Sequence, residues 1–222
     1  MTYTRSHPSP RYVALLDQYR TLHTRGEQFL GIPPEQTFPG QSLIPQVERI
    51  KEYVQRAAAR TLLDYGAGKG LQYLPMSVQS DTGETWPSIL DYWGVETVTC
   101  YDPCYVPFSE LPTGQFDGVI CTDVLEHCPD EDLPWIVDEL FRYSRHFVFA
   151  NVACYPAKKR LPSGENAHCT LRPRAWWEAL LSEVSPRYPH VDWEVWVQSL
   201  HHEGGTTRML EERLARRAPV AA

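Results

Sequence analysis

The residues best suited to chemistry gather in one short segment, Asp123-Val124-Leu125-Glu126-His127. Two carboxyl groups and one imidazole stand at positions i, i+3 and i+4, and His168 follows later in a polar stretch. An imidazole among carboxylates can serve as a general base that removes a proton from an oxygen or nitrogen nucleophile. Mixed carboxylate and imidazole side chains can instead hold a divalent metal ion that activates a hydroxyl group. A structural histidine, held by a hydrogen bond within the fold, is the third interpretation of His127.

A glycine-rich loop is the second chemical signature. In Thr61-Leu62-Leu63-Asp64-Tyr65-Gly66-Ala67-Gly68-Lys69-Gly70 an apolar strand runs directly into three glycines at alternate positions. Glycine permits a sharp turn and a close approach to a ligand, and a following helix would offer unpaired N–H groups. We expect Lys69 to point outward. A dinucleotide fingerprint, G-x-G-x-x-G, needs a glycine where Leu71 stands, so the loop favours another nucleoside-like ligand.

A third polar group, Asp102, follows the apolar run 97–101. In an open α/β sheet, ligands bind outside the carboxyl ends of the strands, where this carboxylate would lie. It could accept both hydroxyls of a ribose. The alternative, that Asp102-Pro103 is only a turn, stays open.

Alternating elements from residue 61 onward must position these groups. Apolar runs predict strands, and apolar residues at helical spacing predict helices. The predicted strands are 62–64, 97–101, 116–121, 147–152 and 191–198, and the predicted helices are 12–19, 47–57, 133–141 and 176–184. The pattern indicates an α/β fold: a Rossmann-like, doubly wound, mostly parallel seven-stranded sheet with helices on both faces. We assign residues 45–222 to the ligand-binding domain and 1–44 to an N-terminal helical extension, in which 26–44 could close as a lid.

The composition of the chain limits the kinds of partner that it is expected to bind. A chain of 222 residues suits one core, and its formal charge of −7 gives no general attraction to nucleic acid. The basic clusters Lys158-Lys159-Arg160 and Arg213/Arg216/Arg217 are interpreted as solvated surface. Six cysteines without a C-x-x-C pair indicate reduced thiols, and no apolar run is long enough for a signal peptide or a membrane span. We therefore expect a cytoplasmic enzyme with no membrane partner; its oligomeric state stays open.

Three segments together resemble a known family. The G-x-G-x-G loop preceded by Asp64, the acid at Asp102 and the block 123–127 are similar to the motifs of the class I S-adenosylmethionine-dependent methyltransferases, in particular a bacterial branch. The resemblance covers about residues 45–200. It implies S-adenosylmethionine as cofactor, with contacts from Asp64, Gly66, Gly68, Gly70, Asp102 and Asp123.

The same resemblance implies methyl transfer to an oxygen or nitrogen of a small or medium-sized acceptor. Catalytic roles fall to His127, His168 and Asp123. The acceptor pocket is expected beside Asn166 and His168, where Trp176 or Trp177 could stack on a ring.

Three alternatives remain at this point. Asp123, Glu126, His127 and His168 are similar to the E-x-x-E-H plus distant His pattern of small-RNA 2′-O-methyltransferases, with Asp in place of the first Glu, and would then hold a divalent metal. A NAD-dependent dehydrogenase is the second alternative. The third is a cofactor-binding partner subunit without catalysis, since an intact binding motif does not establish turnover.

Overall fold

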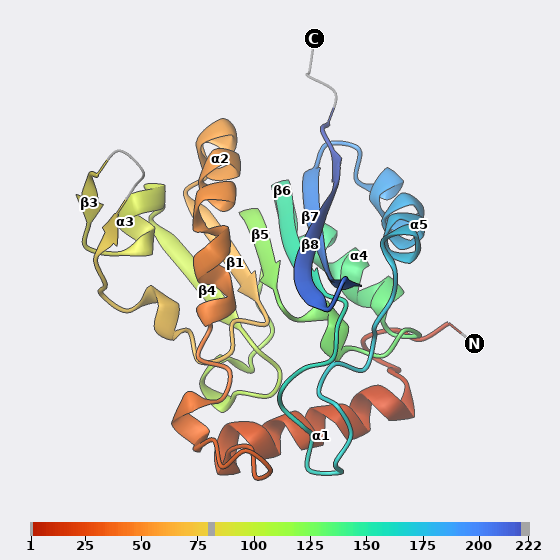
Figure 1. The fold of residues 1–222 in the computed structure, drawn as a ribbon. Helices are drawn as coiled ribbons and strands as arrows, with labels where there is room; N and C mark the ends of the chain where they lie inside the picture. The colour runs from red at the N-terminus through yellow and green to blue at the C-terminus, as the bar shows by residue number, and fades with distance from the viewer. Residues whose placement is uncertain (1, 80–82, 219–222) are drawn as a thin grey trace.

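The fold is built on one twisted, mostly parallel sheet (Figure 1). The computed structural model describes residues 2–79 and 83–218. In these residues the strand order is β4-β1-β5-β6-β7-β8, with only β8 antiparallel. The strands are β1 (Thr61–Tyr65), β4 (Thr97–Tyr101), β5 (Phe116–Thr122), β6 (Ser144–Ala153), β7 (Asp192–Glu203) and β8 (Thr206–Arg216). The α/β class is confirmed. The expected strand number of seven is wrong for the described chain, whose main sheet has six.

Two short strands lie outside the main sheet. β2 (Val78–Gln79) and β3 (Thr85–Trp86) pair with each other in a separate hairpin and do not join the main sheet. They lie in the long connection between β1 and β4, together with α3 (Ile89–Trp93).

Helices cover both faces of the sheet. On one face lie α2 (Val47–Ala57) and α3, and on the other lie α4 (Leu133–Tyr143) and α5 (Arg174–Val184). Successive strand residues point to opposite faces, so Leu62 packs in the α2 core and Leu63 in the α4 core. Both leucines are fully buried. Burial on both faces is why these strands are continuous apolar runs in the sequence. Within the described ranges, no helix is both long and apolar enough to cross a bilayer.

The N-terminal helix α1 (Pro10–Arg25) lies across the carboxyl ends of the strands (Figure 1). Ser9 caps it by accepting from the Tyr12 backbone N–H at 3.0 Å. It ends at Gly26, whose φ of +80° and close approach to Ile32 leave no room for a side chain. Tyr12 packs into the α4 core, so α1 forms a fixed wall along the edge where ligands bind in such sheets.

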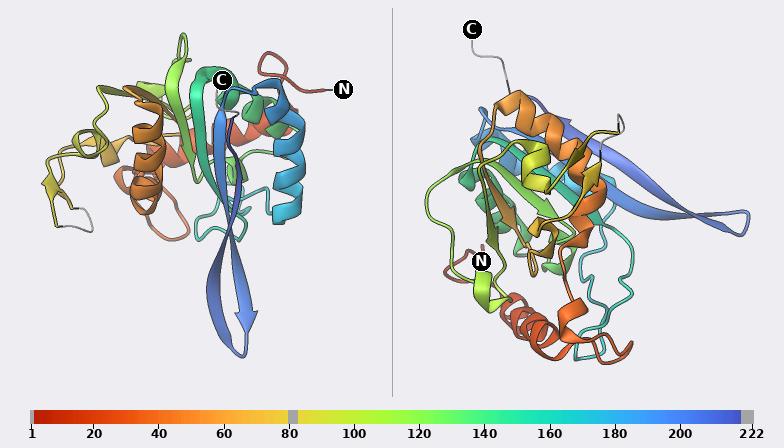
Figure 2. Two further views of the ribbon diagram at one scale, coloured as in Figure 1. Left: turned by 90° about the horizontal axis from the view of Figure 1, so that it is seen from above. Right: turned by 90° about the vertical axis from the view of Figure 1, so that its left-hand side faces the viewer.

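The β7–β8 hairpin extends well beyond the body of the protein (Figure 2). β8 has no apolar pattern in the sequence, because Leu214 is the only buried residue of this strand. Arg213 and Arg216, interpreted as surface charge, lie on this strand and bond to Glu194 and to the Tyr188 carbonyl.

Candidate active site

The N–H groups of the glycine loop donate to the end of β4 and to the loop itself. Gly66 and Ala67 donate their N–H groups to the Tyr101 carbonyl at 2.7 and 3.1 Å, and Gly70 donates to Ala67 at 3.1 Å. Gly68 donates to the Asp102 carboxylate at 3.0 Å.

The remaining N–H groups of the loop donate to carbonyl groups in the segment before α2. Lys69 donates its N–H to the Phe38 carbonyl at 2.8 Å, and Leu71 donates to Pro39 at 3.1 Å. A 3₁₀ turn, Leu71–Tyr73, follows in place of an α-helix. The expectation of a helix with unpaired N–H groups is therefore wrong, because residues 38–39 already satisfy the donors that such a terminus would present.

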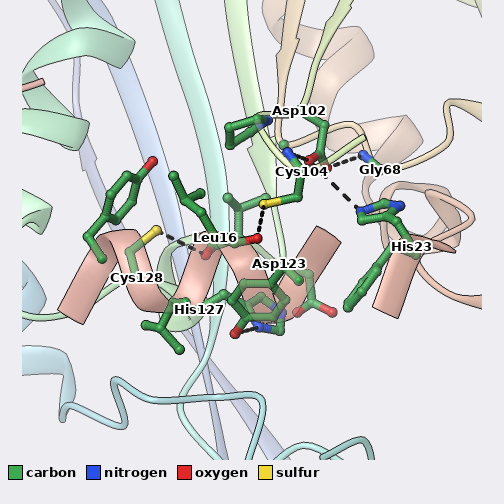
Figure 3. A pocket seen from close by; sticks show the side chains of 15 residues that line it. Leu16, His23, Gly68, Asp102, Cys104, Asp123, His127 and Cys128 are labelled. Atoms are coloured by element: carbon green, nitrogen blue, oxygen red, sulfur yellow. Dashed lines mark hydrogen bonds and ion pairs between the residues drawn. The ribbon is translucent and has the colours of Figure 1, made fainter. Parts of the chain in front are cut away.

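A cavity of about 100 Å³ lies between α1 and the ends of β1, β4 and β5 (Figure 3). Gly66, Gly68, Asp102, Asp123 and His127 line it, so the structure brings together four of the six predicted cofactor residues and two of the three predicted catalytic residues, Asp123 being counted in both sets. We call this the smaller cavity. Its remaining walls are mostly apolar side chains of α1 and of the segment after β5.

Asp102 is held at the wall of the smaller cavity by backbone donors. Its Oδ1 accepts from Cys104 at 2.8 Å and its Oδ2 accepts from Gly68 at 3.0 Å. Burial raises the pKa of this carboxyl group to about 6, against the lowering effect of these N–H groups. Each oxygen keeps a second lone pair, which a hydroxyl donor can use.

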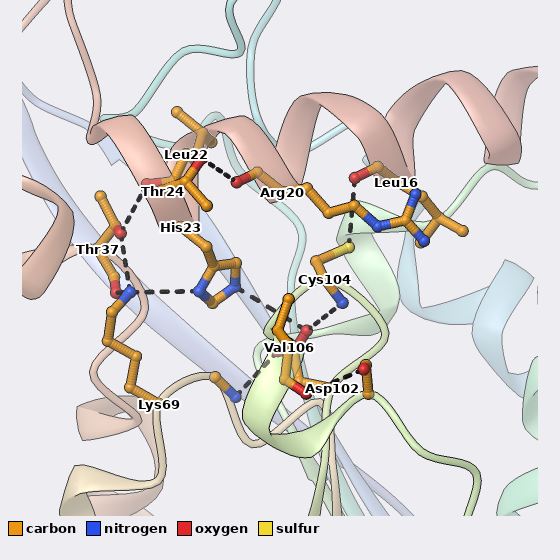
Figure 4. A network of polar contacts seen from close by, with 12 residues as sticks. Leu16, Arg20, Leu22, His23, Thr24, Thr37, Lys69, Asp102, Cys104 and Val106 are labelled. Atoms are coloured by element: carbon orange, nitrogen blue, oxygen red, sulfur yellow. Dashed lines mark hydrogen bonds and ion pairs between the residues drawn. The ribbon is translucent and has the colours of Figure 1, made fainter.

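Lys69 points inward, contrary to expectation (Figure 4). Its Nζ donates to the Thr37 carbonyl at 2.8 Å and to His23 Nδ1 at 3.2 Å. His23 Nε2 lies 3.9 Å from Asp102 Oδ1. Burial, followed by the Lys69 charge, lowers the pKa of His23 to about 4, so the ring is neutral near pH 7. This chain of contacts joins α1, the glycine loop and the end of β4.

Asp64 and Gly70 lie beneath the site and do not line the smaller cavity. Asp64 is 1% exposed, and its Oδ2 accepts from Gln72 Nε2 at 2.9 Å and from the Tyr73 hydroxyl at 2.8 Å. Burial raises its pKa to about 7. A Cβ at Gly70 would approach Phe108 to 2.9 Å. Asp64 therefore supports the loop from within the core, and a contact of Asp64 or Gly70 with the cofactor stays a prediction.

Asp123 has a φ of +60°, in the left-handed region that few non-glycine residues adopt. Such strained residues persist where the surrounding structure holds them, and they gather at ligand sites. Its neighbour Val124 packs on Gly66, where a Cβ would come within 2.3 Å of the valine side chain. The close contact explains why glycine is needed here, and it holds Asp123 at the rim of the site.

A larger cavity, of about 440 Å³, adjoins the first and shares Phe38, Gly66, Gly68, Asp123 and His127 with it. Its other walls come from residues 36–42, from the loop after β6 and from His168. The two predicted catalytic histidines meet here, with ring centroids 4.8 Å apart in an edge-to-face arrangement.

Both imidazoles are oriented by backbone carbonyls. His127 Nδ1 lies 2.9 Å from the Ala167 carbonyl, and His168 Nδ1 lies 2.6 Å from the Tyr155 carbonyl. A carbonyl only accepts, so Nδ1 carries the proton in each ring and Nε2 keeps its lone pair. The Tyr19 hydroxyl of α1 also donates to Ala167, at 2.5 Å.

Burial keeps both histidines neutral. It lowers the pKa of His127 to about 4 and lowers that of His168 as well. Each ring can therefore accept a proton at neutral pH.

The alternative metal set does not assemble. Glu126 is fully buried, and its Oε1 accepts from the Ala153 N–H at 2.7 Å. Burial, then the neighbouring Asp123 carboxylate, raises the pKa of Glu126 well above its ordinary value, which favours the neutral acid. In residues 2–79 and 83–218, no group of three or more His, Cys, Asp or Glu side chains is placed to hold a metal ion.

The other residues expected at the acceptor pocket hold the fold together instead of lining the larger cavity. Asn166 Oδ1 accepts from the N–H groups of Ala157 and His168, at 2.9 and 3.0 Å, and so shapes the loop. Trp177 is buried in the core, Trp176 packs beside it, and neither lines the larger cavity.

Sequence analysis missed several residues that the fold brings to the site: Tyr19, His23, Phe38 and Lys159. Tyr19 and His23 carry a weak signal, since both place a polar group on the buried side of a helix. Phe38 and Lys159 carry none, because they lie in irregular segments whose path only the fold determines.

Two curated proteins are similar to this chain in sequence. No protein-family model matches the chain. The chain is 28% identical over 141 residues to a ubiquinone biosynthesis O-methyltransferase of Bordetella bronchiseptica, and 27% identical over 179 residues to that of Bordetella avium. These matches cover 54% and 70% of this chain, and 58% and 72% of the relatives.

One solved structure is also similar. Magnesium protoporphyrin IX methyltransferase from Synechocystis PCC 6803, with bound SAH, aligns over 93% of this chain and 95% of its own at 15% identity. The TM-score of this alignment is 0.44.

The sheet, the glycine loop and the acid after β4 agree with the resemblance of this chain to the class I S-adenosylmethionine-dependent methyltransferases. The particular relatives are O-methyltransferases, and the first match spans a little over half of that relative's length.

Proposed function

We propose that this protein transfers the methyl group of S-adenosylmethionine to an oxygen of a small or medium-sized acceptor. The observation that carries the proposal is the junction of the two cavities, which share Gly66, Gly68, Asp123 and His127. A cofactor on one side and an acceptor on the other would meet there. The name of both relatives favours oxygen over nitrogen as the nucleophile.

The residues of the smaller cavity suit this cofactor. Asp102 offers free lone pairs to the ribose hydroxyls, and Gly66 and Gly68 let a ligand approach the backbone. Asp123 offers an anion to the cofactor's positive charge. A volume of about 100 Å³ is small for a nucleoside, so we infer that Phe38 and the adjoining lid residues move to admit it.

When bound, the cofactor supplies an electrophilic methyl group. His127 Nε2 is the proposed base, and it would take the proton of the acceptor hydroxyl as the new oxygen–carbon bond forms. The sulfur–methyl bond would break at the same time, with S-adenosylhomocysteine as the leaving group. The Ala167 carbonyl fixes the tautomer that leaves this nitrogen unprotonated. General base catalysis contributes about 10²–10⁴-fold, whereas orientation of the reacting groups can supply about 7–11 kcal/mol. Positioning by the cavity walls is therefore the larger contribution.

The glycine loop argues against the dehydrogenase alternative. A dinucleotide site presents unpaired N–H groups at a helix N-terminus to the pyrophosphate. Here every N–H from Gly66 to Leu71 already has an acceptor, and no α-helix follows.

Calorimetry tests the proposal directly. We expect S-adenosylhomocysteine to bind the purified chain and NAD to show no heat of binding. Asp102→Asn removes charge-assisted hydrogen bonds and should weaken S-adenosylhomocysteine binding by about tenfold or more. Exposed Asp91 of α3 provides a control, since Asp91→Asn leaves the affinity unchanged.

Two outcomes would contradict the proposal: NAD binding, or a folded sample that does not bind S-adenosylhomocysteine. Binding without methylation of any hydroxyl acceptor would instead favour the non-catalytic partner subunit.

A further inference from the structure

Lys159 is a lysine of the larger cavity that the sequence suggested was surface charge. It follows β6 and is only partly exposed, whereas its neighbour Lys158 is exposed. Its Nζ lies 5.0 Å from the centre of the Phe38 ring, which the two cavities share. The ammonium group is therefore held at the wall of the larger cavity, close to the junction.

This ammonium group has no ion-pair partner: across residues 2–79 and 83–218, no carboxylate lies within 4.0 Å of it. Asp123 and Glu27 are the carboxyl groups that act on it from farther away. Glu27 is already engaged, since its oxygens accept from the N–H groups of Arg160 at 3.2 Å and Leu30 at 2.6 Å. Burial outweighs both carboxylates and lowers the pKa of Lys159. A partly desolvated cation without a partner is costly, and an anionic ligand would remove that cost.

The charge of the whole larger cavity points the same way. Its lining contains two ammonium groups, Lys158 and Lys159, and one carboxylate, Asp123, while both histidines are neutral. The lining is thus positive by one charge, although the chain carries −7. The aromatic rings of Phe38 and Tyr155, with the two imidazoles, give flat faces that suit an aryl ring.

From this geometry we propose that the larger cavity binds an aryl acceptor bearing a carboxylate, with the carboxylate paired to Lys159 and the hydroxyl placed at His127. The inference rests on the proposed methyl transfer, whose acceptor it describes. It makes Lys159 a specificity residue of the acceptor side.

The test compares two probes that differ only in the carboxylate, 3,4-dihydroxybenzoate and catechol. Their affinities are measured by calorimetry, with and without saturating S-adenosylhomocysteine. We expect the wild-type protein to bind the dihydroxybenzoate at least about tenfold more tightly than catechol, as a charge-assisted pair provides. Lys159→Gln should abolish the difference, and Lys159→Arg, which keeps the charge, should retain part of it.

Lys51 of α2 provides a matched control, because it is also a partly exposed lysine over aromatic rings and lines neither cavity. Its Nζ lies 3.4 Å from the ring centre of Tyr92 in α3. Lys51→Gln should keep the full preference for the carboxylate. Equal affinities in the wild type, a preference that survives Lys159→Gln, or no binding of either probe would overturn the inference. Failure of the proposed function has a different result, namely that S-adenosylhomocysteine does not bind. The affinities of the two probes measured without S-adenosylhomocysteine do not depend on that result, so the two failures can be told apart.

Discussion

The two adjoining cavities are built in different ways. The smaller cavity lies between the side chains of α1 and the ends of β1, β4 and β5, where main-chain hydrogen bonds of 2.7–3.2 Å connect the loops. The larger cavity is enclosed by irregular segments distant in the sequence, residues 36–42 and 155–168. From this difference we infer that binding on the cofactor side depends on the positions of backbone groups. Binding on the acceptor side depends on side chains of loops, which tolerate substitution.

Their charges differ as well. The smaller cavity holds the carboxylates of Asp102 and Asp123 and a neutral His23, whereas the larger adds Lys158 and Lys159. A cationic cofactor and an anionic acceptor would each find the opposite charge. Such a division would favour correct placement of the two ligands before any reaction occurs.

His127 is where the largest effect is expected, because it belongs to both cavities. His127→Gln removes the base and should lower kcat by about 10²–10⁴-fold. S-adenosylhomocysteine affinity should change little, because His127 is assigned to the proton and not to the cofactor. Steady-state kinetics and calorimetry on the same sample measure the two effects, with exposed His190→Gln as the control.

The pH profile checks the same residue. With the pKa of His127 lowered to about 4, the base is already neutral at pH 5.5, so kcat should show no His127 titration between pH 5.5 and 8. If kcat fell with a midpoint near pH 6.5 and this fall disappeared in His127→Gln, the lowered pKa of His127 would be contradicted. An unchanged kcat in the variant would remove His127 from catalysis.

Gly68→Ala would break the smaller cavity selectively. The added Cβ would lie 2.3 Å from the Phe38 carbonyl and adopt a φ of +58°. We expect the lid contact to open and S-adenosylhomocysteine affinity to fall by about 10–100-fold, roughly 1.4–2.7 kcal/mol. Gly94→Ala is the matched control, because its φ of +75° imposes similar backbone strain with no atom within 4 Å. If both variants bound the ligand equally, the contact between Phe38 and the loop would not matter for the cofactor.

Asp64→Asn should have the smallest effect on ligand binding. It tests how the buried Asp64 carboxyl group stabilises the loop next to the smaller cavity. Burial raises the pKa of Asp64 from 3.8 to about 7. The native state thus holds this proton more tightly than the unfolded chain, so the stability contribution is complete below about pH 4 and is lost as pH rises to about 7. The free energy of unfolding of the variant, relative to wild type, should therefore rise by up to about 1.4 kcal/mol per pH unit across that window.

Urea denaturation at several pH values measures this difference, and Asp91→Asn should show no such trend. Binding of S-adenosylhomocysteine at pH 5.5 should change less than about threefold, since Asp64 is only 1% exposed. A flat stability difference would mean that Asp64 is ionised in the native state.

Local patterns were enough to predict much of the fold. The apolar runs at β1, β5 and β6 identified strands because each is buried on both faces. β8 escaped prediction because almost all of its side chains are exposed and its stability comes from pairing with β7. The amides of the glycine loop were misjudged for a related reason: their acceptors, Phe38 and Pro39, lie about 30 positions earlier in the chain.

The sequence by itself determined the sheet class, the glycine loop and the polar groups at strand ends, since these depend on neighbours a few positions apart. Only the tertiary structure decided which groups reach a ligand: it buried Asp64 and Glu126, turned Lys69 inward, and brought Tyr19, Phe38 and Lys159 to the site. The physical reason is that accessibility and charge pairing arise between segments distant in sequence. Their relative placement follows from packing of the whole core.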